Sequence, residues 1–201
     1  MIVYLCCAHE GEVRDLHRSL KYLYRFFNAR HAAQYPVVVF HDFLTHTHIA
    51  RLQDEVRQAQ RSHAAARGAH WHDGGAAGLS FVPIDNATFS LPPSLAHLRG
   101  QIPRSIRGYG MGHRHMCRFF SAAVFSHPAL RPYTYVWRLD TDSFLLGEAA
   151  ADPFAQMEAA GATYGWVHAF RDDPMFVTGL WQAFARPCAR ACARACHVEY
   201  T

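Results

Sequence analysis

Two kinds of hydrophobic pattern alternate along the first half of the chain. Short apolar runs occupy residues 2–7, 37–40 and 79–84, and runs of this length that are rich in β-branched residues predict buried strands. Between them, apolar residues recur at spacings of three and four, which is the repeat of an amphipathic helix. These positions are Val13, Leu16, Leu20, Leu23 and Phe27 in a first helix, and Ile49, Leu52 and Val56 in a second helix that starts at Thr45 or Thr47.

The alternation continues in the second half. Residues 62–78 show no repeat and predict a surface loop. After the third strand, we expect a helix over 113–128 that ends at Pro128 and a strand over 133–147. A further helix is expected over 152–161, with Asp152 as its cap, Pro153 in its first turn and Gly161 at its end. A last strand is expected over 163–170. Strands that alternate with helices predict an α/β layered fold with a largely parallel sheet.

Composition limits the class of protein. The chain has 201 residues, enough for one domain or for a large fragment of a bigger one, and it is 50% hydrophobic and 18% charged, as globular proteins are. A net charge of +4, without a dense run of arginines, favours an anionic ligand but does not require nucleic acid. No apolar segment approaches the ~18 residues of a membrane span, and the first ten residues do not resemble a signal peptide. Because the first residues already form a core strand, we expect that a preceding segment has been lost.

The six cysteines fall into two groups. Cys6, Cys7 and Cys117 lie in apolar stretches and are expected in the core. Cys188, Cys192 and Cys196 recur every four residues in an Ala-Arg-Cys repeat, which would place three thiols on one helical face. A structural metal site and a low-complexity tail are both compatible with this spacing, although zinc sites usually contain C-x2-C pairs.

Two like charges follow the apolar run over residues 133–139. In an extended chain, Asp140 and Asp142 would project to the same side, while Thr141 would point to the opposite side. Two close carboxylates repel each other unless a cation lies near them, and a hard divalent cation with oxygen ligands meets that need. The carboxyl end of a buried strand is also where open α/β sheets bind ligands. The alternative is a solvated turn that contains two incidental acids.

Three stretches of the chain resemble one family, in the family's order. Residues 112–144 read GHRHMCRFFSAAVFSHPALRPYTYVWRLDTDSF. This block is similar to the signature Y-R-H-M-C-R-F, S-G-F-F-x-x-H-P and Y-W-R-V-E-P-D of glycosyltransferase family 15, the fungal-type α-1,2-mannosyltransferases. Residues 25–42 and 152–170 also agree with the family's motifs. The resemblance covers about residues 2–182.

The resemblance implies a fold, an activity and a location. The fold is GT-A, a Rossmann-like sheet that binds a nucleotide sugar through a divalent cation, usually Mn²⁺, and it is incomplete here at the C-terminus. The reaction transfers mannose from GDP-mannose to the 2-hydroxyl of a mannosylated glycan or glycoprotein acceptor, with retention of the α configuration. The family implies the Golgi lumen and a type II membrane anchor in the full-length form, with no nucleic-acid partner.

The same resemblance assigns candidate site residues. Asp142 falls on the family's metal-binding Asp, and Asp140 stands where the family has Glu, so these two are the expected metal ligands. The expected donor-binding residues are His113, Arg114, Arg118, Arg138 and Asp140. Arg114 and Arg118 are expected around a helix start, which favours an anion, although a surface ion pair is the alternative for each arginine.

The chain also departs from the family. His113 replaces the tyrosine that opens the family's Y-R-H-M-C-R motif, and the segment after the first strand lacks the usual arginine. The resemblance stops near Trp181, before the family's acceptor site, a histidine metal ligand and the proposed nucleophile, so the catalytic residues are unknown. We therefore expect a partial GT-A domain over 1–182 and a low-complexity tail over 183–201.

Three functional hypotheses follow. The first is a retaining mannosyltransferase whose chain ends early, and the second is a nucleotide-sugar-binding module without transfer activity. The third is a metal-dependent hydrolase built on Asp140, Asp142 and neighbouring histidines. It is the weakest, because no H-E-x-x-H motif accompanies the acids and the H-x-H of His113 and His115 lies inside the family block.

Deleting the chain from Pro187 onward is expected to leave the melting temperature within about two degrees, since an unpacked terminus adds nothing to stability. Thermal unfolding of the deleted and intact chains measures this. A large drop would show that the cysteine-containing tail belongs to the fold.

Overall fold

The computed structural model of this chain describes residues 1–6, 9–30, 34–68, 78–85, 88–103, 105–106, 109–167, 171–179, 181–182 and 185. Its backbone divides into two compact units, Met1–Asp152 and Pro153–Thr201. The larger unit contains the sheet and all the expected site residues. Within the described residues, no helix is both long enough and apolar enough to cross a bilayer.

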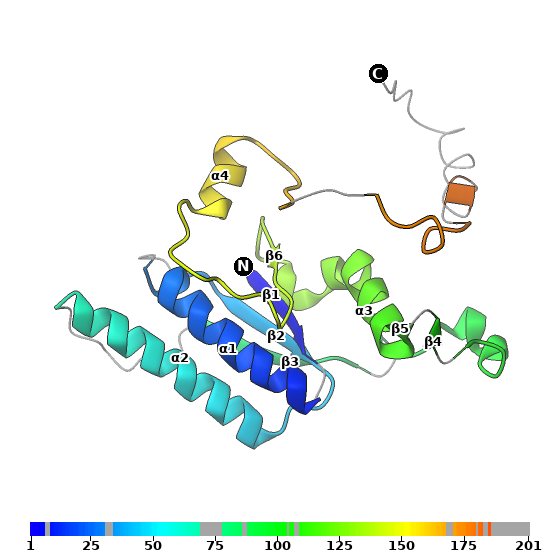
Figure 1. Ribbon diagram of the computed structural model, residues 1–201, viewed down its shortest axis with the longest axis horizontal. Coiled ribbons are helices and arrows are strands. Elements are labelled where there is room, and N and C mark those ends of the chain that lie inside the picture. The colour runs from blue at the N-terminus through cyan, green and yellow to red at the C-terminus, as the bar shows by residue number, and fades with distance from the viewer. Residues whose placement is uncertain are drawn as a thin grey trace. The chain divides into compact units, whose positions relative to one another are not determined.

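The larger unit is built on a sheet of four parallel strands in the order β3-β2-β1-β6 (Figure 1). The strands are β1 (Ile2–Cys6), β2 (Val37–His41), β3 (Leu79–Pro83) and β6 (Trp137–Arg138). The first three confirm the strands predicted from their apolar runs. The strand expected over residues 133–147 is confirmed only at Trp137–Arg138, the two residues that pair with β1. The predicted α/β fold with a parallel sheet is therefore confirmed.

The order of the strands reverses at β1. The chain passes from β1 to β2 and β3 through α1 (Glu10–Phe26) and α2 (His46–Ala66), moving outward along one side of β1. It then returns to the other side of β1, where β6 pairs in the register Ile2↔Trp137 and Val3↔Arg138. In open α/β sheets, ligands bind outside the carboxyl ends of the strands at such a reversal. The topology therefore marks the ends of β1 and β6 as the candidate site.

Helices α1 and α2 lie side by side on one face of the sheet (Figure 1). Leu16, Leu20 and Leu23 of α1 are fully buried beneath them. Tyr4 of β1 faces the same layer, because its hydroxyl forms a hydrogen bond with Ser19 of α1. This face confirms the amphipathic repeat that predicted the first helix.

The opposite face of the sheet is covered by a second apolar cluster. Its buried members are Met1, Val3, Leu5, Val38, Phe40, Phe119, Val124 and Leu130. The Phe40 ring meets the Phe119 ring edge to face, with 5.1 Å between their centroids. The centroid of the His127 ring lies 4.8 Å from that of Phe40. Because both faces are covered, β1 and β2 are buried along their whole length, and their sequences are continuous apolar runs.

Local sequence sets the starts of the two covering helices. His9 caps α1, since its Nδ1 accepts a hydrogen bond from the Gly11 amide at 3.2 Å. Thr45, one of the two predicted starts, caps α2 and forms a capping box with His48. The loop predicted over residues 62–78 is wrong over 62–66, because α2 continues to Ala66 through alanines that favour a helix. Residues 69–77 lie outside the described residues.

The helix predicted over 113–128 is confirmed only in its first part. α3 (Met111–Ser121) ends at Ala122, whose backbone angles (φ −148°, ψ −60°) are not helical. The break allows the 3₁₀ helices η3 (Ala123–Ser126) and η4 (Pro128–Leu130) to turn their apolar residues into the core. The other short elements of this unit are η1 (Asn28–Arg30), η2 (Pro93–Leu98), β4 (Ser105–Ile106) and β5 (Tyr109–Gly110).

The cysteines differ from expectation in one place. Cys6 is buried in β1, as predicted. The prediction of a core position for Cys117 is wrong, because α3 turns Phe119 into the core and leaves Cys117 exposed. Cys7 and the three cysteines of the tail lie outside the described residues.

The smaller unit contains α4 (Pro153–Ala159), which confirms the predicted helix. Gly161 follows with a φ of 58°, a left-handed conformation that suits glycine at a helix end. The strand predicted over 163–170 is wrong over residues 163–167, which have no strand partner and expose Trp166 and Val167. Residues 168–170 lie outside the described residues. The domain boundary at residue 182 stays a prediction.

Replacing Phe40 by alanine is expected to lower the free energy of unfolding by about 3–5 kcal/mol, because it opens a cavity between β2 and the Phe119 ring. Urea unfolding followed by circular dichroism measures the change. Phe43→Ala is the matched control, since that ring is 71% exposed and its loss is expected to cost about 0.5 kcal/mol or less. Equal losses for the two variants would contradict the assignment of the core.

Candidate functional site

The expected metal ligands lie where the chain leaves β6. Leu139 is buried, and residues Asp140 to Ser143 then form a turn, in which the Ser143 amide donates to the Asp140 carbonyl at 2.9 Å. The Asp140 amide in turn donates to the Ser143 Oγ at 3.1 Å. The prediction that Asp140 and Asp142 share one side of an extended strand is therefore wrong, because β6 ends at Arg138. Both side chains are exposed at the sheet edge.

A buried hydrogen-bond chain ties this turn to the centre of the fold. Ser19 of α1 is fully buried, and its hydroxyl donates to the Ser143 carbonyl at 2.5 Å. A serine hydroxyl has a single proton, so the Tyr4 hydroxyl must be the donor in its 2.9 Å bond to Ser19. Tyr4 lies in β1 and is itself fully buried. The central strand, the first helix and the acidic turn are thus connected through two side chains and the backbone carbonyl of Ser143.

The residue after the turn packs against α1. The Phe144 ring meets the Tyr22 ring edge to face at 6.3 Å, and the Arg18 guanidinium lies 5.6 Å from its centroid. These contacts flank the hydrogen bond from Ser19 to Ser143. Together they fix the turn on the side of α1.

Arg138 connects the acidic turn to α3. Its Nη2 and Nε donate to the Oδ1 of Asp140 at 2.8 and 3.1 Å, and its guanidinium lies 4.1 Å from the centroid of the Phe120 ring. The Met116 sulfur also lies 3.6 Å from Nη2. One oxygen of Asp140 is therefore engaged. Among the described residues, the Asp142 carboxylate has no recorded hydrogen bond or ion pair, so it is free to bind a cation.

The other expected donor-binding residues occupy two faces of α3. By the helical repeat, His113 shares the face of Met116 and Phe120 that meets Arg138, and its ring lies 4.4 Å from that of Tyr109. Arg114 and Arg118 lie on the other face. Arg114 donates to the Pro103 carbonyl at 2.6 Å, and Arg118 donates to the Thr88 carbonyl.

The expectation that both arginines flank a helix start is wrong for Arg118, which lies in the last turn of α3. The two arginines also affect a neighbouring histidine. Burial lowers the pKa of His115, and the charges of Arg118 and Arg114 lower it further. His115 is therefore held neutral near pH 7.

His41 also lies at this edge of the sheet, at the end of β2. Histidines that follow a strand are usually solvated, but His41 is buried. Its Nδ1 accepts a hydrogen bond from the Leu44 amide at 3.1 Å, and burial lowers its pKa. His41 thus holds the loop after β2 through its Nδ1.

The donor set at the turn fits a hard divalent cation, because carboxylate oxygens are the ligands that Mn²⁺ and Mg²⁺ accept. The set is small. Within the described residues, no group of three or more His, Cys, Asp or Glu side chains can hold a metal ion. Asp140 and Asp142 would therefore leave most coordination positions to a ligand, to water or to another part of the protein.

Sequence reasoning missed Tyr4, Ser19, Ser143 and Phe144. The pattern does contain a signal for Ser19, because this polar residue stands on the apolar face of its helix between Leu16 and Leu20. A buried hydroxyl requires a partner, and that requirement points to a contact across the fold. The identity of the partner depends on the return of the chain to β1, which no local pattern encodes.

Comparison with known proteins gives one consistent family. Residues 1–189 match the model of a family described as glycolipid 2-alpha-mannosyltransferase. O-glycoside alpha-1,2-mannosyltransferase homolog 2 of Schizosaccharomyces pombe is 39% identical over 71 residues, which are 35% of this chain and 19% of that protein. Homolog 4 of the same yeast is 32% identical over 103 residues, 48% of this chain and 23% of that protein.

Solved structures agree with the fold. Core-mannan synthase A (CmsA/Ktr4) from Aspergillus fumigatus, in its Mn/GDP form, superposes with a TM-score of 0.68 at 24% identity. The superposition covers 94% of this chain and 47% of the synthase chain. The mannosyltransferase Ktr4p from Saccharomyces cerevisiae in complex with GDP gives a TM-score of 0.66 at 19% identity, with 94% and 45% covered. The GT-A-type fold is confirmed, and the chain spans less than half the length of these structures.

Replacing Ser19 by alanine is expected to lower the free energy of unfolding by about 1–3 kcal/mol, because the Tyr4 hydroxyl and the Ser143 carbonyl lose a buried partner. Amide hydrogen exchange is expected to rise most at Asp140 and Ser143. Ser62→Ala, at an exposed position of α2, is the control and is expected to leave both unchanged. Unchanged exchange in the turn of Ser19→Ala would show that Ser19 does not hold it.

Proposed function

Because the chain belongs to the glycolipid 2-alpha-mannosyltransferase family, we propose that it forms the donor-binding part of a retaining α-1,2-mannosyltransferase. The donor is GDP-mannose, and the acceptor is a mannose of a glycan or glycoprotein. The observation that supports this most directly is the position of Asp140 and Asp142 at the reversal of strand order, where α/β sheets bind nucleotides. By family resemblance, the full-length protein works in the Golgi lumen on a membrane anchor.

Mn²⁺ is the proposed cofactor, and Asp142 and the free oxygen of Asp140 would hold it. When bound, the cation neutralises the diphosphate charge that develops as GDP leaves. Two structural relatives support this assignment, since one is described in an Mn/GDP form and the other in complex with GDP. The small donor set at the turn is also consistent with a cation that takes phosphate oxygens as further ligands.

Arg138 is the proposed phosphate contact within the described site. Nε and Nη2 hold Asp140, and Nη1 remains for a phosphate oxygen of the donor. The guanidinium of Arg138 stacks over the Phe120 ring, and this contact limits the motion of the arginine side chain. His113, Arg114 and Arg118 complete the proposed donor-binding set, and in this structure the two arginines donate to the carbonyls of Pro103 and Thr88.

A second candidate is a nucleotide-sugar-binding module without transfer activity. The observation that favours it is that every candidate residue of the described site would bind the donor or its metal, and none is assigned a catalytic role. In both candidates the acidic turn binds the donor. They differ in whether an acceptor site and catalytic groups accompany it.

Replacing Asp142 by asparagine is expected to weaken the Mn²⁺-dependent binding of GDP by at least about tenfold, because a charged ligand is lost while the shape is kept. Calorimetric titration of GDP with Mn²⁺ present measures this. Asp54→Asn, an exposed position of α2 that pairs with Arg57, is the control. Equal GDP affinities of wild type and Asp142→Asn in the presence of Mn²⁺ would show that Asp142 does not bind the metal.

The 201-residue chain is expected to bind the donor weakly and to transfer mannose negligibly. Holding donor and acceptor together lowers a barrier by about 7–11 kcal/mol, and a chain that holds only the donor loses most of that gain. Incubation with GDP-mannose, Mn²⁺ and an α-mannoside, followed by analysis for a disaccharide, measures transfer. Robust formation of a disaccharide would show that the catalytic groups lie within these residues, and would reject the binding-module candidate.

A further inference from the structure

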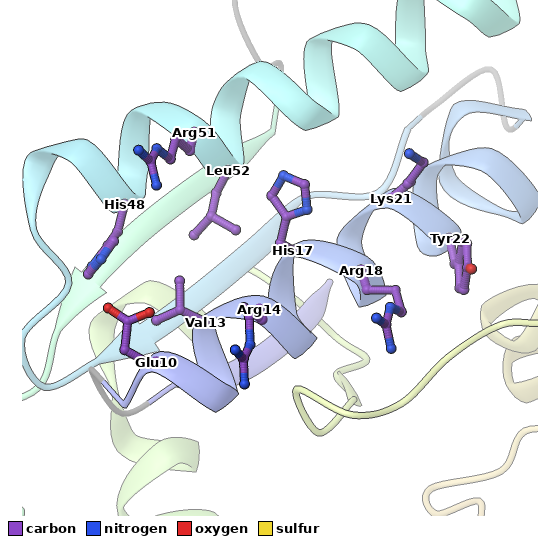
Figure 2. Close-up of a pocket in the computed structure, with 10 residues that line it drawn as sticks. All are labelled: Glu10, Val13, Arg14, His17, Arg18, Lys21, Tyr22, His48, Arg51 and Leu52. Atoms are coloured by element: carbon purple, nitrogen blue, oxygen red, sulfur yellow. The ribbon is translucent and has the colours of Figure 1, made fainter.

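A groove runs between α1 and α2 (Figure 2). Its volume is about 520 Å³, within the range of small-molecule sites. The lining residues are Glu10, Val13, Arg14, His17, Arg18, Lys21 and Tyr22 of α1, and His48, Arg51 and Leu52 of α2. None of them belongs to the turn Asp140–Ser143 or to β6. The groove therefore shares no residue with the proposed donor site, although Arg18 and Tyr22 contact Phe144, the residue after the turn.

The groove is strongly basic. Arg14, Arg18, Lys21 and Arg51 bring four permanent positive charges to it, and Glu10 is its single lining acid. Arg14 and Arg18 stand one turn apart on the same helix, a spacing at which like charges destabilise a helix. The described residues contain no recorded ion pair for Arg14 or Arg51. Glu10 in the lining and Glu55 beside Lys21 offset two of these four charges, so the groove keeps a net positive charge within the described part of the chain.

Partners below and beside the groove hold some of these cations in place. Glu55 of α2, whose side chain is only 10% exposed, contacts Nε2 of His17 at 3.1 Å and Nζ of Lys21 at 3.4 Å. Arg18 is held on its other side by the Phe144 ring. Cations that are already ordered lose less entropy when they bind an anion.

The floor of the groove is apolar. Figure 2 shows Val13 and His17 pointing toward α2, and Leu52 pointing back toward α1. The lining combines this floor with the arginines Arg14, Arg18 and Arg51. Such a lining matches a ligand that has a phosphate group and an attached organic part, since arginine binds phosphate oxygens through paired N–H donors. We propose that this groove binds an organic phosphate, independently of Mn²⁺.

The phosphate has two possible sources that share this chemistry, a soluble phosphate ester and the head group of an anionic lipid. Two probes distinguish them. Inorganic pyrophosphate reports the free anion, and phosphatidylcholine vesicles that contain phosphatidic acid report the lipid. Both titrations use the 201-residue chain with EDTA present, because the proposed donor site binds a diphosphate only with its metal.

The test variant is Arg14→Gln with Arg51→Gln, which removes one unpaired cation from each helix and keeps good helix formers at both positions. The matched control is Arg25→Gln with Arg57→Gln, which removes one arginine from each of the same helices outside the groove lining. Both double variants have the same net charge, so a non-specific charge effect moves them equally.

We expect wild type to bind pyrophosphate or the vesicles in EDTA, with binding that weakens as salt is added. The test variant is expected to bind about tenfold more weakly, and the control variant and Asp142→Asn are expected to bind as wild type does. If the chain binds the vesicles but not pyrophosphate, the ligand is the lipid head group. If it binds pyrophosphate but not the vesicles, the ligand is a soluble phosphate ester. Absence of binding to both probes would overturn the proposal, as would equal losses in the test and control variants. Neither of those results would affect the metal-dependent binding assigned to Asp142.

Discussion

The pairing of β6 with the free edge of β1 is the interaction on which the rest of the structure depends. β1 is buried on both faces and paired on both edges, so it fixes the positions of everything attached to it. The two-residue register of β6 delivers residues 139–143 to the carboxyl end of β1. Without this return there would be no reversal of strand order, and the two aspartates would have no sheet edge to occupy.

The fold was predictable from the sequence where local patterns suffice. The apolar runs of β1 to β3 and the helical repeats of α1 and α2 correctly predicted buried positions, and Thr45 correctly predicted the start of α2. The errors arose where tertiary contacts override the pattern. Residues 133–147 look like one strand because Leu139 and Phe144 are apolar, yet they pack against separate parts of the fold around a turn. Ala122 breaks a regular helical pattern so that Val124 can reach the core.

The candidate site was only partly predictable. The D-x-D spacing and the family motif pointed to Asp140, Asp142 and Arg138, and these three residues do lie together. The groups that hold them could not be inferred, since Tyr4 and Ser19 reach the turn across more than a hundred residues of sequence. Helix α1 has two roles in this account. Its buried side holds the acidic turn through Ser19, and its exposed side contributes most of the cations of the basic groove.

The central claim is that a divalent cation and a nucleotide diphosphate meet at the turn Asp140–Ser143. The paramagnetism of Mn²⁺ tests it directly, because it broadens the nuclear magnetic resonance signals of nearby amides. In a spectrum of the 201-residue chain with GDP and substoichiometric Mn²⁺, the account predicts the strongest broadening at the amides from Arg138 to Ser143, with the amides at the end of α2 unaffected. Broadening centred on another part of the chain, with the signals of this turn retained, would contradict it.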